Sequence, residues 1–568
     1  MKNLAFLQIL SILTVFSGPA YAQSQTAYGS KIMVVTAHPE ATRIGYEILK
    51  SGGSAADAAV AVQLALGLVE PQASGIGGGT VALYYDAATK QVHTFDGREV
   101  APMEAGQYLF RGEDGKPMSF EDAAVGGRAV GVPGTLRALE LMHKKFGSRP
   151  WRDLFSPTIG LAEEGFTVSK RLAAAVAKDE GNLQFFNDAL LYFFPDAATP
   201  INEGGRLKNY LYASLLRKIA LDGPDAFYKG ANAELVAKRV HDDHDNPGLL
   251  SIEDMAAYEA IERKSVCKTY RGYLICTAGE PTAGGMMVLS SLGVVANFDL
   301  ASKGPMDAGA WNLIVEAERL ALADKNYYMG DPHYVQSPGE RLLDADYLKT
   351  RAALISPDTA SLKVMYGNPP GWEKLKPAAK EPVYPKPPGT SHISIVDSRG
   401  NIVSMTSSVQ DTFGSRIMVN GYMLNNQLGE FSFIPEIDGK PVANRVEGGK
   451  RPLFDAAPLI VFSPDGAPFL VIGSAGGSGI PGYVLQRVIA MIDWKQDLVS
   501  ALAAPNVINR GREIEMEEGA AYLVDSLKAK GHPVKTLGLV SGINAISFAG
   551  GMMTGAADTR REGTAMGE

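Results

Sequence analysis

Two hydroxyl residues, Thr390 and Ser408, are predicted to face each other across a β-hairpin. The segment "TSHISIVDSRGNIVSMTSS" has two runs of strand-forming residues around a three-residue loop, Ser398-Arg399-Gly400, which ends in the glycine such loops favour. Pairing Asp397 with Asn401 and counting outward places Thr390 opposite Ser408. A slip of one residue would undo this pairing, because it moves every side chain to the other face.

A threonine hydroxyl becomes a useful nucleophile only when a base takes its proton. If the chain is cut before Thr390, the freed α-amine, whose ordinary pKa is about 8, can act as that base. Gly389 offers an unhindered carbonyl, and the Pro- and Lys-rich stretch 369–388 before it is typical of an exposed linker. We therefore predict self-cleavage between Gly389 and Thr390 by an N-to-O acyl shift; the alternative is a Pro-rich loop that simply enters a hairpin.

The two cysteines of the chain, Cys267 and Cys276, lie in "CKTYRGYLIC". If Arg271-Gly272 forms a two-residue hairpin turn, the cysteines stand directly opposite each other on neighbouring strands. This placement suits a cross-strand disulfide in an oxidising compartment. Two unpaired thiols are the alternative.

Other motifs carry weaker signals. "GIGGG" at 75–79 lacks the Lys-Ser/Thr of a phosphate loop and the spacing of a dinucleotide fingerprint, so we interpret it as close backbone packing near the active site. His241 and His244 in "HDDHD" are metal-ligand types, but their surface-loop context favours solvated side chains over a metal site. The sequence has neither a G-x-S-x-G elbow nor an H-E-x-x-H motif, so serine-hydrolase and zinc-protease interpretations lack support.

The elements that must position these residues alternate between strand and helix periods. A buried strand is predicted at 31–39, a helix at 39–53, and, after a capping box at Ser54, an Ala-rich helix that Pro71 ends. Beyond the linker, strands are predicted at 391–397, 401–408, 458–474 and 545–556, and helices at 482–494 and 520–531. The alternation predicts a layered α/β or α+β body.

Composition describes a globular chain. Its 568 residues are 46% hydrophobic, enough to bury a core of several domains' size. The net charge is -8, and no long Lys/Arg block could neutralise a phosphate backbone. These features argue against a nucleic-acid partner.

The first 22 residues have the pattern of a signal peptide. Lys2 precedes an apolar run at 4–16, and Ala20-Tyr21-Ala22 gives the small-x-small cleavage pattern. A membrane anchor is the alternative, but the run is shorter than the ~20 residues a spanning helix needs. We expect a soluble periplasmic or secreted protein with no membrane partner.

Several longer motifs resemble one family. "GGSAADAAVAVQLALGLVEPQASGIGGG", "DGREVAP", "GVPGT", "GTSHISIVDSRGNIVSMTSS", "NNQ", "GKRP", "GSAGGSG" and "GAADTRREG" occur in that order across nearly the whole mature chain. Together they resemble the γ-glutamyltransferase (glutathione hydrolase) family of N-terminal nucleophile hydrolases. The resemblance implies an α+β fold, a four-layer αββα sandwich, in a proenzyme that cuts itself into a large subunit (23–389) and a small catalytic subunit (390–568). It requires no metal or organic cofactor.

The resemblance also implies roles for individual residues. Thr390 is the nucleophile and Ser408 its hydrogen-bonding partner, while the backbone N–H groups of Gly476 and Gly477 form the oxyanion hole. Arg98 grips the α-carboxylate of a γ-glutamyl donor, for which a guanidinium is well suited. The donor's α-amino group is held by Gln410, Gln427 and Glu430.

The chain departs from the family pattern at the carboxylate end of this site. Phe454 and Asp455 stand where the family has a Ser-Ser pair that helps bind the donor. Two like charges ~4–5 Å apart cost roughly 3–4 kcal/mol at an effective dielectric of ~20, over a hundredfold in affinity. γ-Glutamyl binding therefore suffers unless Asp455 points away or pairs with Arg98. Gly429 replaces an acidic residue, and the lid-loop stretch 431–451 is short.

We therefore expect a self-processing γ-glutamyltransferase that moves a γ-glutamyl group from glutathione or a related amide, through acyl-Thr390, to water or an amino acid. Large and small subunits of one precursor would form a heterodimer. One alternative is an N-terminal threonine amidase or acylase with a different acyl specificity, as in the cephalosporin acylases. Another is a non-catalytic periplasmic binding protein on the same fold.

Overall fold

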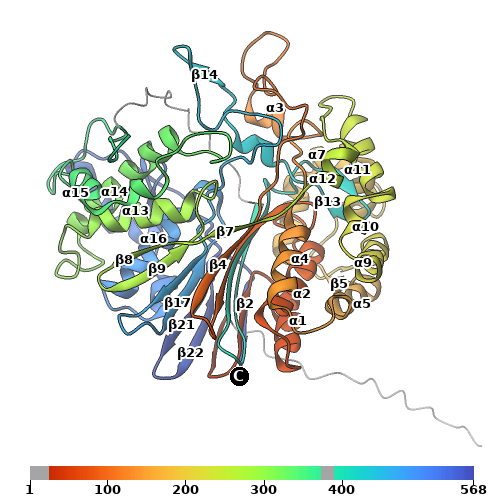
Figure 1. Ribbon diagram of the computed structural model, residues 1–568, viewed down its shortest axis with the longest axis horizontal. Helices are drawn as coiled ribbons and strands as arrows, with labels where there is room; N and C mark the ends of the chain where they lie inside the picture. Colours follow the sequence, from red (N-terminus) through yellow and green to blue (C-terminus); the bar gives the residue numbers. More distant parts are fainter. Residues whose placement is uncertain (1–24, 373–388) are drawn as a thin grey trace, which may run out of the picture.

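Two antiparallel seven-stranded sheets stack face to face in the centre of the molecule (Figure 1). The structure is a computed structural model that describes residues 25–372 and 389–568, so the predicted signal peptide and linker residues 373–388 lie outside it. The first sheet has the order β1 (Thr26–Gly29), β22 (Met552–Ala557), β21 (Asn544–Ala549), β17 (Pro468–Gly473), β16 (Leu459–Phe462), β9 (Tyr273–Thr277), β8 (Val266–Tyr270). The second has the order β23 (Thr564–Gly567), β2 (Met33–Thr36), β10 (Gly389–Val396), β11 (Ile402–Gln410), β3 (Gly79–Asp86), β4 (Gln91–Gly97), β7 (Ile261–Lys264).

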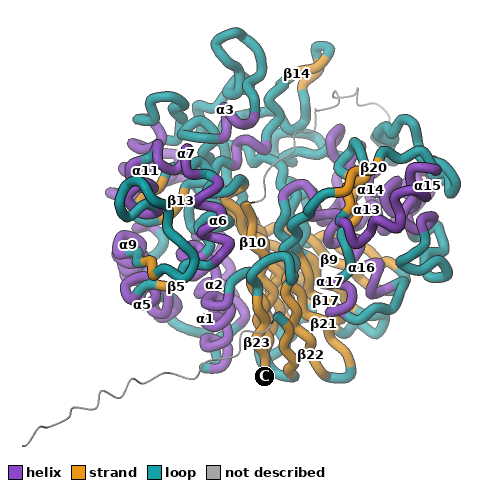
Figure 2. The backbone as a smooth tube through the Cα atoms, turned by 180° about the vertical axis from the view of Figure 1, so that it is seen from behind, coloured by secondary structure: helices purple, strands orange, loops and turns teal. Residues whose placement is uncertain are grey.

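Helices cover the outer face of each sheet. The second sheet is covered by α1 (Pro39–Lys50), α2 (Ala55–Val69) and α4 (Thr135–Phe146), and the first by α13 (Gly284–Val295), α14 (Ala308–Tyr328) and α16 (Ile480–Ile492) (Figures 1 and 2). The other described α-helices are α3 (Phe120–Ala124), α5 (Ser156–Glu164), α6 (Lys170–Lys178), α7 (Glu180–Phe185), α8 (Asn187–Phe193), α9 (Tyr210–Asp222), α10 (Asp225–Tyr228), α11 (Ala231–His241), α12 (Ile252–Ala257), α15 (Ala345–Ala352), α17 (Leu498–Ala503) and α18 (Val524–Ala529). The predicted four-layer αββα sandwich is confirmed.

The core has one apolar layer at each interface of the sandwich. In β2, Val34 packs toward α1 and α2, whereas its neighbours Met33 and Val35 pack between the sheets. This alternation follows from the two-residue period of a strand that is buried on both faces. A third layer joins the first sheet to α13, α14 and α16.

Local signals in the sequence agree closely with several elements. Ser54 and Asp57 form a capping box at the start of α2, and Gly52, with φ 88°, follows the end of α1. One predicted helix is wrong in detail: residues 520–531 form a 3-10 turn at Glu518–Leu523 before α18 begins. Helical periodicity does not distinguish the tighter turn from an α-helix over so short a segment.

Residues on both sides of position 389 contribute strands to both sheets. In the second sheet, β10 and β11 lie between β2 and β3. In the first sheet, β16 pairs with β9, and β22 pairs with β1. The segments before and after Gly389 are therefore interleaved rather than divided into separate domains.

None of the helices within residues 25–372 and 389–568 combines the length and apolar character needed to cross a membrane.

Candidate active site

Thr390 lies opposite Ser408 in the β10–β11 pair, as the loop chemistry predicted. Gly400 has φ 82°, and the amide of Asp397 donates to the carbonyl of Asn401 at 3.0 Å, which closes the predicted loop. Directly opposite residues present their side chains on the same face of a sheet. The two hydroxyl oxygens, Thr390 Oγ1 and Ser408 Oγ, are 3.0 Å apart and buried.

Ser408 also contacts the peptide bond that is predicted to be cut. Its hydroxyl donates to the carbonyl oxygen of Gly389 at 2.7 Å and accepts from the amide of Gln410 at 2.8 Å. The strand register shifts between Gly389 and Thr390, so a bulge lies at this bond. Bulges are common next to active sites, where they redirect a peptide group. Ser408 thus lies against both the hydroxyl and the carbonyl that would react.

No ionisable side chain contacts the hydroxyl of Thr390 in the described part of the chain. Ser408 Oγ is the one side-chain partner of Thr390 Oγ1 there. The nearby His392 is fully buried, and burial lowers its pKa to about 3, so its imidazole stays neutral. Its ring nitrogens contact the hydroxyls of Thr406 and Ser394 instead. Among the described residues, no titratable side chain forms a hydrogen bond with Thr390 Oγ1.

Arg98 lies just after β4 and is completely buried. Its Nε donates to the carbonyl of Pro452 at 3.2 Å, and its Nη2 donates to the carbonyl of Leu453 at 2.6 Å. Its Nη1 donates to Gln427 Oε1 at 2.5 Å and to Glu99 Oε2 at 3.3 Å. Four of the five N–H groups of the guanidinium are therefore engaged within the protein.

Gln427 connects this arginine to β11, and Gln410 contacts Glu430. Gln427 Nε2 donates to the carbonyl of Ser408 at 3.4 Å, so Arg98, Gln427 and Ser408 form one chain of contacts. Gln410, with φ 82°, donates from Nε2 to Glu430 Oε1 at 3.2 Å. The structure thus brings together the predicted residues for the donor's carboxylate and its amino group.

Phe454 contacts Arg98, whereas its neighbour Asp455 contacts a different residue. The ring of Phe454 lies over the guanidinium of Arg98, with 4.3 Å between Cζ and the ring centroid. Asp455 instead forms an ion pair with Lys325 of α14. Because its charge is paired there, Asp455 does not present an unpaired anion to Arg98. The predicted like-charge penalty is therefore removed by a lysine that sequence reasoning did not identify.

Glu99 is a second residue that the sequence analysis missed. A side chain at Gly79 would place its Cβ 2.1 Å from Glu99 Oε2, so the carboxyl group fills the space of the absent side chain. Gly79 is directly opposite Ser408 in the β11–β3 register, which places this carboxyl beside Ser408 on the same face. Glu99 Oε1 has no hydrogen-bond partner among the described residues, and burial raises the pKa of Glu99 to about 8.

The "GIGGG" segment packs against this site, as expected. A Cβ at Gly78 would lie 2.2 Å from the carbonyl oxygen of Ser408, a separation that side chains do not tolerate. Glycine is required there because the start of β3 approaches the β10–β11 hairpin so closely.

Gly476 and Gly477 follow β17 in the facing sheet, with φ values of 129° and 59° that favour glycine. Gly473, at the end of β17, lies directly against the imidazole of His392. Arg561 provides a further link: it donates to the carbonyl of Thr390 at 2.9 Å and to that of Val540 at 3.5 Å. The Val540 oxygen lies 3.3 Å from where a Gly476 side chain would begin.

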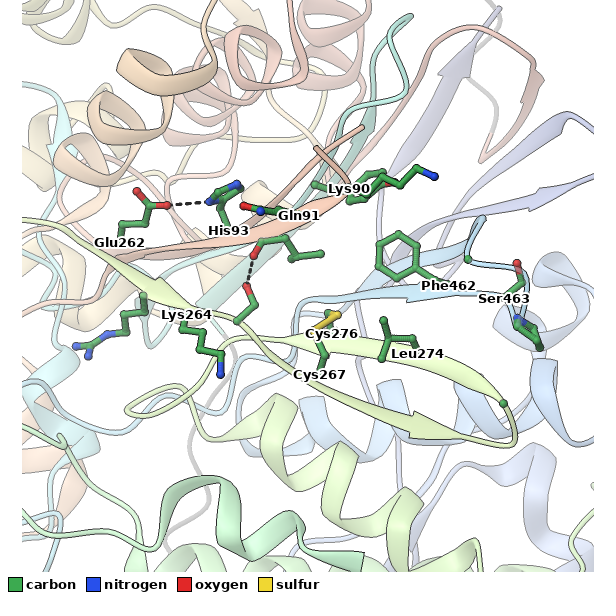
Figure 3. Close-up of a pocket in the computed structure, with 17 residues that line it drawn as sticks. Lys90, Gln91, His93, Glu262, Lys264, Cys267, Leu274, Cys276, Phe462 and Ser463 are labelled. Atoms are coloured by element: carbon green, nitrogen blue, oxygen red, sulfur yellow. Dashed lines mark hydrogen bonds and ion pairs between the residues drawn. A yellow bond between two sulfur atoms is a disulfide. The ribbon is translucent and has the colours of Figure 1, made fainter. Parts of the chain in front are cut away.

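The cysteines lie away from these residues. Cys267 and Cys276 are paired in register on β8 and β9 and are joined by an S–S bond of 2.09 Å. They line a cavity of about 800 Å³ at the edge of the sandwich, together with Leu274, Phe462 and His93, whose ring contacts Glu262 (Figure 3). Thr390, Ser408 and Arg98 do not line this cavity. It is therefore separate from the candidate active site.

The histidines of "HDDHD" have ordinary partners. His241 contacts the carbonyl of Leu250, and the exposed His244 pairs with Asp245. Within residues 25–372 and 389–568, no group of three or more His, Cys, Asp or Glu side chains is arranged to hold a metal ion.

Comparison with known proteins places this site in a family. The family described as gamma-glutamyltranspeptidase matches residues 41–568. The chain is 35% identical to the glutathione hydrolase proenzyme of Bacillus subtilis (strain 168), covering 100% of this chain and 98% of that relative. It is 32% identical to the acylase ACY 1 proenzyme of Pseudomonas sp. (strain SE83), covering 95% and 94%.

The fold agrees with a solved structure. The cephalosporin acylase from Bacillus halodurans superposes with a TM-score of 0.82 at 24% identity, covering 98% of this chain and 99% of that one. At this identity the likeness concerns the fold. From the family match and the identity to its full-length relatives, we conclude that the chain belongs to the gamma-glutamyltranspeptidase family.

Proposed function

We propose that the chain is a proenzyme that cuts itself before Thr390 and then transfers γ-glutamyl groups through an acyl-Thr390 intermediate. The observation that carries this proposal is the position of Ser408, which lies 3.0 Å from Thr390 Oγ1 and 2.7 Å from the Gly389 carbonyl oxygen. The names of the relatives, which include glutathione hydrolase proenzymes, support it.

Self-cleavage would proceed in two steps. Thr390 Oγ attacks the carbonyl carbon of Gly389, while the hydrogen bond from Ser408 stabilises charge on the carbonyl oxygen. The C–N bond breaks, the hydroxyl proton passes to the leaving nitrogen, and an ester joins Gly389 to Thr390. Water then hydrolyses the ester, which leaves a carboxylate on Gly389 and a free hydroxyl and α-amine on Thr390.

The mature residue would then use its own amine. The α-amine takes the hydroxyl proton as Thr390 Oγ bonds to the acyl carbon of the donor, and the resulting ammonium returns that proton to the leaving amine. Backbone N–H groups of Gly476 and Gly477 would stabilise the oxyanion. Water or an amino acid then takes the acyl group from Thr390 by the same steps in reverse.

The donor would be glutathione or a related γ-glutamyl amide. Glu430 and Gln410, in contact with each other, offer oxygen atoms to an α-ammonium. Arg98 would hold the α-carboxylate with its remaining N–H group and with the N–H group that Gln427 would release. The pairing of Asp455 with Lys325 removes the electrostatic objection to this donor.

A second candidate function is an acylase with another acyl specificity. Arg98 is completely buried, four of its N–H groups are engaged, and Phe454 covers its face. A donor without an α-carboxylate would need no rearrangement there. The similarity to an acylase proenzyme supports this alternative.

One experiment separates these functions. The purified, self-processed protein is incubated with glutathione and released glutamate is measured, with Thr390→Ala as the matched control. Glutamate release by the wild type alone supports the γ-glutamyl assignment. A protein that splits before Thr390 but leaves glutathione intact favours the acylase. A chain that stays as one uncut band contradicts both enzymes and favours a binding protein.

The maturation scheme includes two further proposals. Removal of residues 1–22 would accompany export to the periplasm or medium, and cleavage would yield a heterodimer of residues 23–389 and 390–568. N-terminal sequencing of the purified chains tests both positions.

A further inference from the structure

Arg561 is a buried cation whose guanidinium contacts the backbone of Thr390. It lies between β22 and β23, 171 residues from Thr390 in sequence, and its Nη1 donates to the carbonyl oxygen of Thr390 at 2.9 Å. In an extended residue the α-nitrogen and the carbonyl oxygen are only about 3 Å apart. The guanidinium therefore lies within about 6 Å of the nitrogen that becomes the α-amine after cleavage.

The charge of Arg561 is poorly compensated. None of the carboxylates in the described ranges forms an ion pair with it, and its Nε has no partner there. The adjacent Arg560, by contrast, pairs with both Glu517 and Asp558. Burial lowers the pKa of Arg561 to about 9, which still leaves the guanidinium charged at neutral pH.

Other ionisable groups surround this contact at slightly greater range. Ser391 donates to Glu70, which is paired with Arg171 of α6, and the amide of Arg171 donates to Glu562. Asp558 and Tyr483 also act electrostatically on Arg561, and His38 lies near Glu70, Glu562 and Arg171. On the strands around Thr390, the titratable groups include the neutral His392, the buried Glu99 beside Gly79, and Asp411, which is paired with Arg416. Among residues 25–372 and 389–568, Arg561 is the one charged side chain with a hydrogen bond to the backbone of Thr390.

We propose that Arg561 is a positioning residue that keeps the α-amine of mature Thr390 in its neutral, proton-accepting form. The inference rests on the proposed function, because only an enzyme that uses this amine as its base needs it neutral. A like charge a few ångströms away in a buried site disfavours the ammonium form. The hydrogen bond to the Thr390 carbonyl also fixes the residue that carries both base and nucleophile.

The test is the pH dependence of kcat/KM for an anilide of the acyl group that the wild type accepts. The acid limb of this profile reports the pKa of the essential base in the free enzyme. An ordinary N-terminal amine titrates at about 7.7. We expect the wild-type limb below about pH 7, and we expect Arg561→Met to raise it by about one unit. Arg561→Lys, which keeps the charge, should stay closer to the wild type.

Glu70→Gln provides a test of opposite sign. Removing this negative charge should move the acid limb of the profile to lower pH. If Glu70 and Arg561 had a purely structural role, the substitution would lower activity without moving the limb. If Arg561→Met fails to split, Glu70→Gln decides the question on a variant that retains Arg561.

The possible outcomes distinguish a failure of the proposed function from a failure of the proposed role of Arg561. A wild type that neither splits nor turns over any acyl anilide contradicts the proposed function and this inference together. An active wild type whose acid limb lies at or above about pH 7.7 overturns the inference alone. An unmoved limb in a processed Arg561→Met, or in Glu70→Gln, overturns it as well.

Discussion

The hydroxyl of Ser408 donates to the carbonyl oxygen of Gly389 at 2.7 Å while its oxygen lies 3.0 Å from Thr390 Oγ1. One side chain thus contacts both reacting groups of the proposed self-cleavage. The contact is present in the uncut chain, so the proposed precursor would already hold the carbonyl polarised and the proposed nucleophile close.

Replacing Ser408 by alanine should slow self-cleavage roughly a hundredfold, since loss of one preorganised donor to a developing oxyanion has about that effect. Ser407→Ala is the matched control. Ser407 immediately precedes Ser408 in β11 and, by the alternation that places Val403 and Met405 in the helix-side core, faces the helix layer. Its buried hydroxyl has no partner among the described residues. The rate is followed as the single band divides on a denaturing gel. Equal rates for the two variants would show that Ser408 does not assist cleavage.

The ion pair between Lys325 and Asp455 gives a prediction about the donor site. Asp455→Asn should change KM for a γ-glutamyl anilide less than about threefold, because Lys325 already neutralises the carboxylate. A gain in affinity above tenfold would instead mean that Asp455 opposes the donor.

The same pair should matter for stability. Lys325→Met leaves the carboxylate of Asp455 unpaired in a largely buried position, which should cost about 2 kcal/mol or more. A smaller loss in the double variant Lys325→Met/Asp455→Asn, measured by denaturant unfolding, would assign this cost to the uncompensated charge. Additive losses would argue against direct coupling.

Glu99 predicts a pH-dependent stability. Burial raises the pKa of its carboxyl to about 8, above the value of an exposed glutamate. Between these two pH values the folded protein keeps a proton on Glu99 that the unfolded chain releases. The contribution of Glu99 to the free energy of unfolding is therefore fully present below about pH 4.5 and is lost as pH rises to about 8. Glu99→Gln stays neutral throughout, so its stability relative to the wild type should increase by roughly 2–4 kcal/mol over this range.

Thermal unfolding of the uncut Thr390→Ala protein, with and without Glu99→Gln, measures this difference without interference from cleavage. A difference in melting temperature that stays constant from pH 5 to 8 would show that Glu99 is ionised in the folded protein.

After cleavage, the two chains should remain together in native buffer. Strands β10 and β11, which would belong to the small subunit, lie between β2 and β3 of the proposed large subunit, so separation would require breaking the second sheet on both sides. Size-exclusion chromatography of the processed protein should give one peak that contains both chains, eluting with uncut Thr390→Ala. Two separate peaks without denaturant would contradict the interleaved arrangement.

Local chemistry explains why parts of the site could be predicted from the sequence. The loop at residues 398–400 fixes the register of β10 and β11, and the turn at Arg271-Gly272, where both residues have positive φ, fixes the pairing of the cysteines. In each case turn geometry sets the register of the flanking strands within a few residues. The family motifs supplied the four-layer fold.

The remaining parts of the site depend on contacts between distant segments. Lys325 reaches Asp455 across 130 residues, and Arg561 reaches Thr390 across 171. No local period or turn signal records which helix or loop will meet a strand, so neither partner was identified. Glu99 was not identified because its carboxyl fills the space beside Gly79, a contact that depends on the three-dimensional fold and has no local signal in the sequence.

The interleaved strands also restrict what a population of these molecules can do over time. If the chain is cut as proposed, strands of each half are held between strands of the other, so halves from different molecules could exchange only by breaking a sheet. A damaged half could not be replaced by a fresh copy, and a cell that made a defective variant beside the normal one would contain two pure populations rather than hybrids. Each molecule would keep the same two chains from folding until degradation.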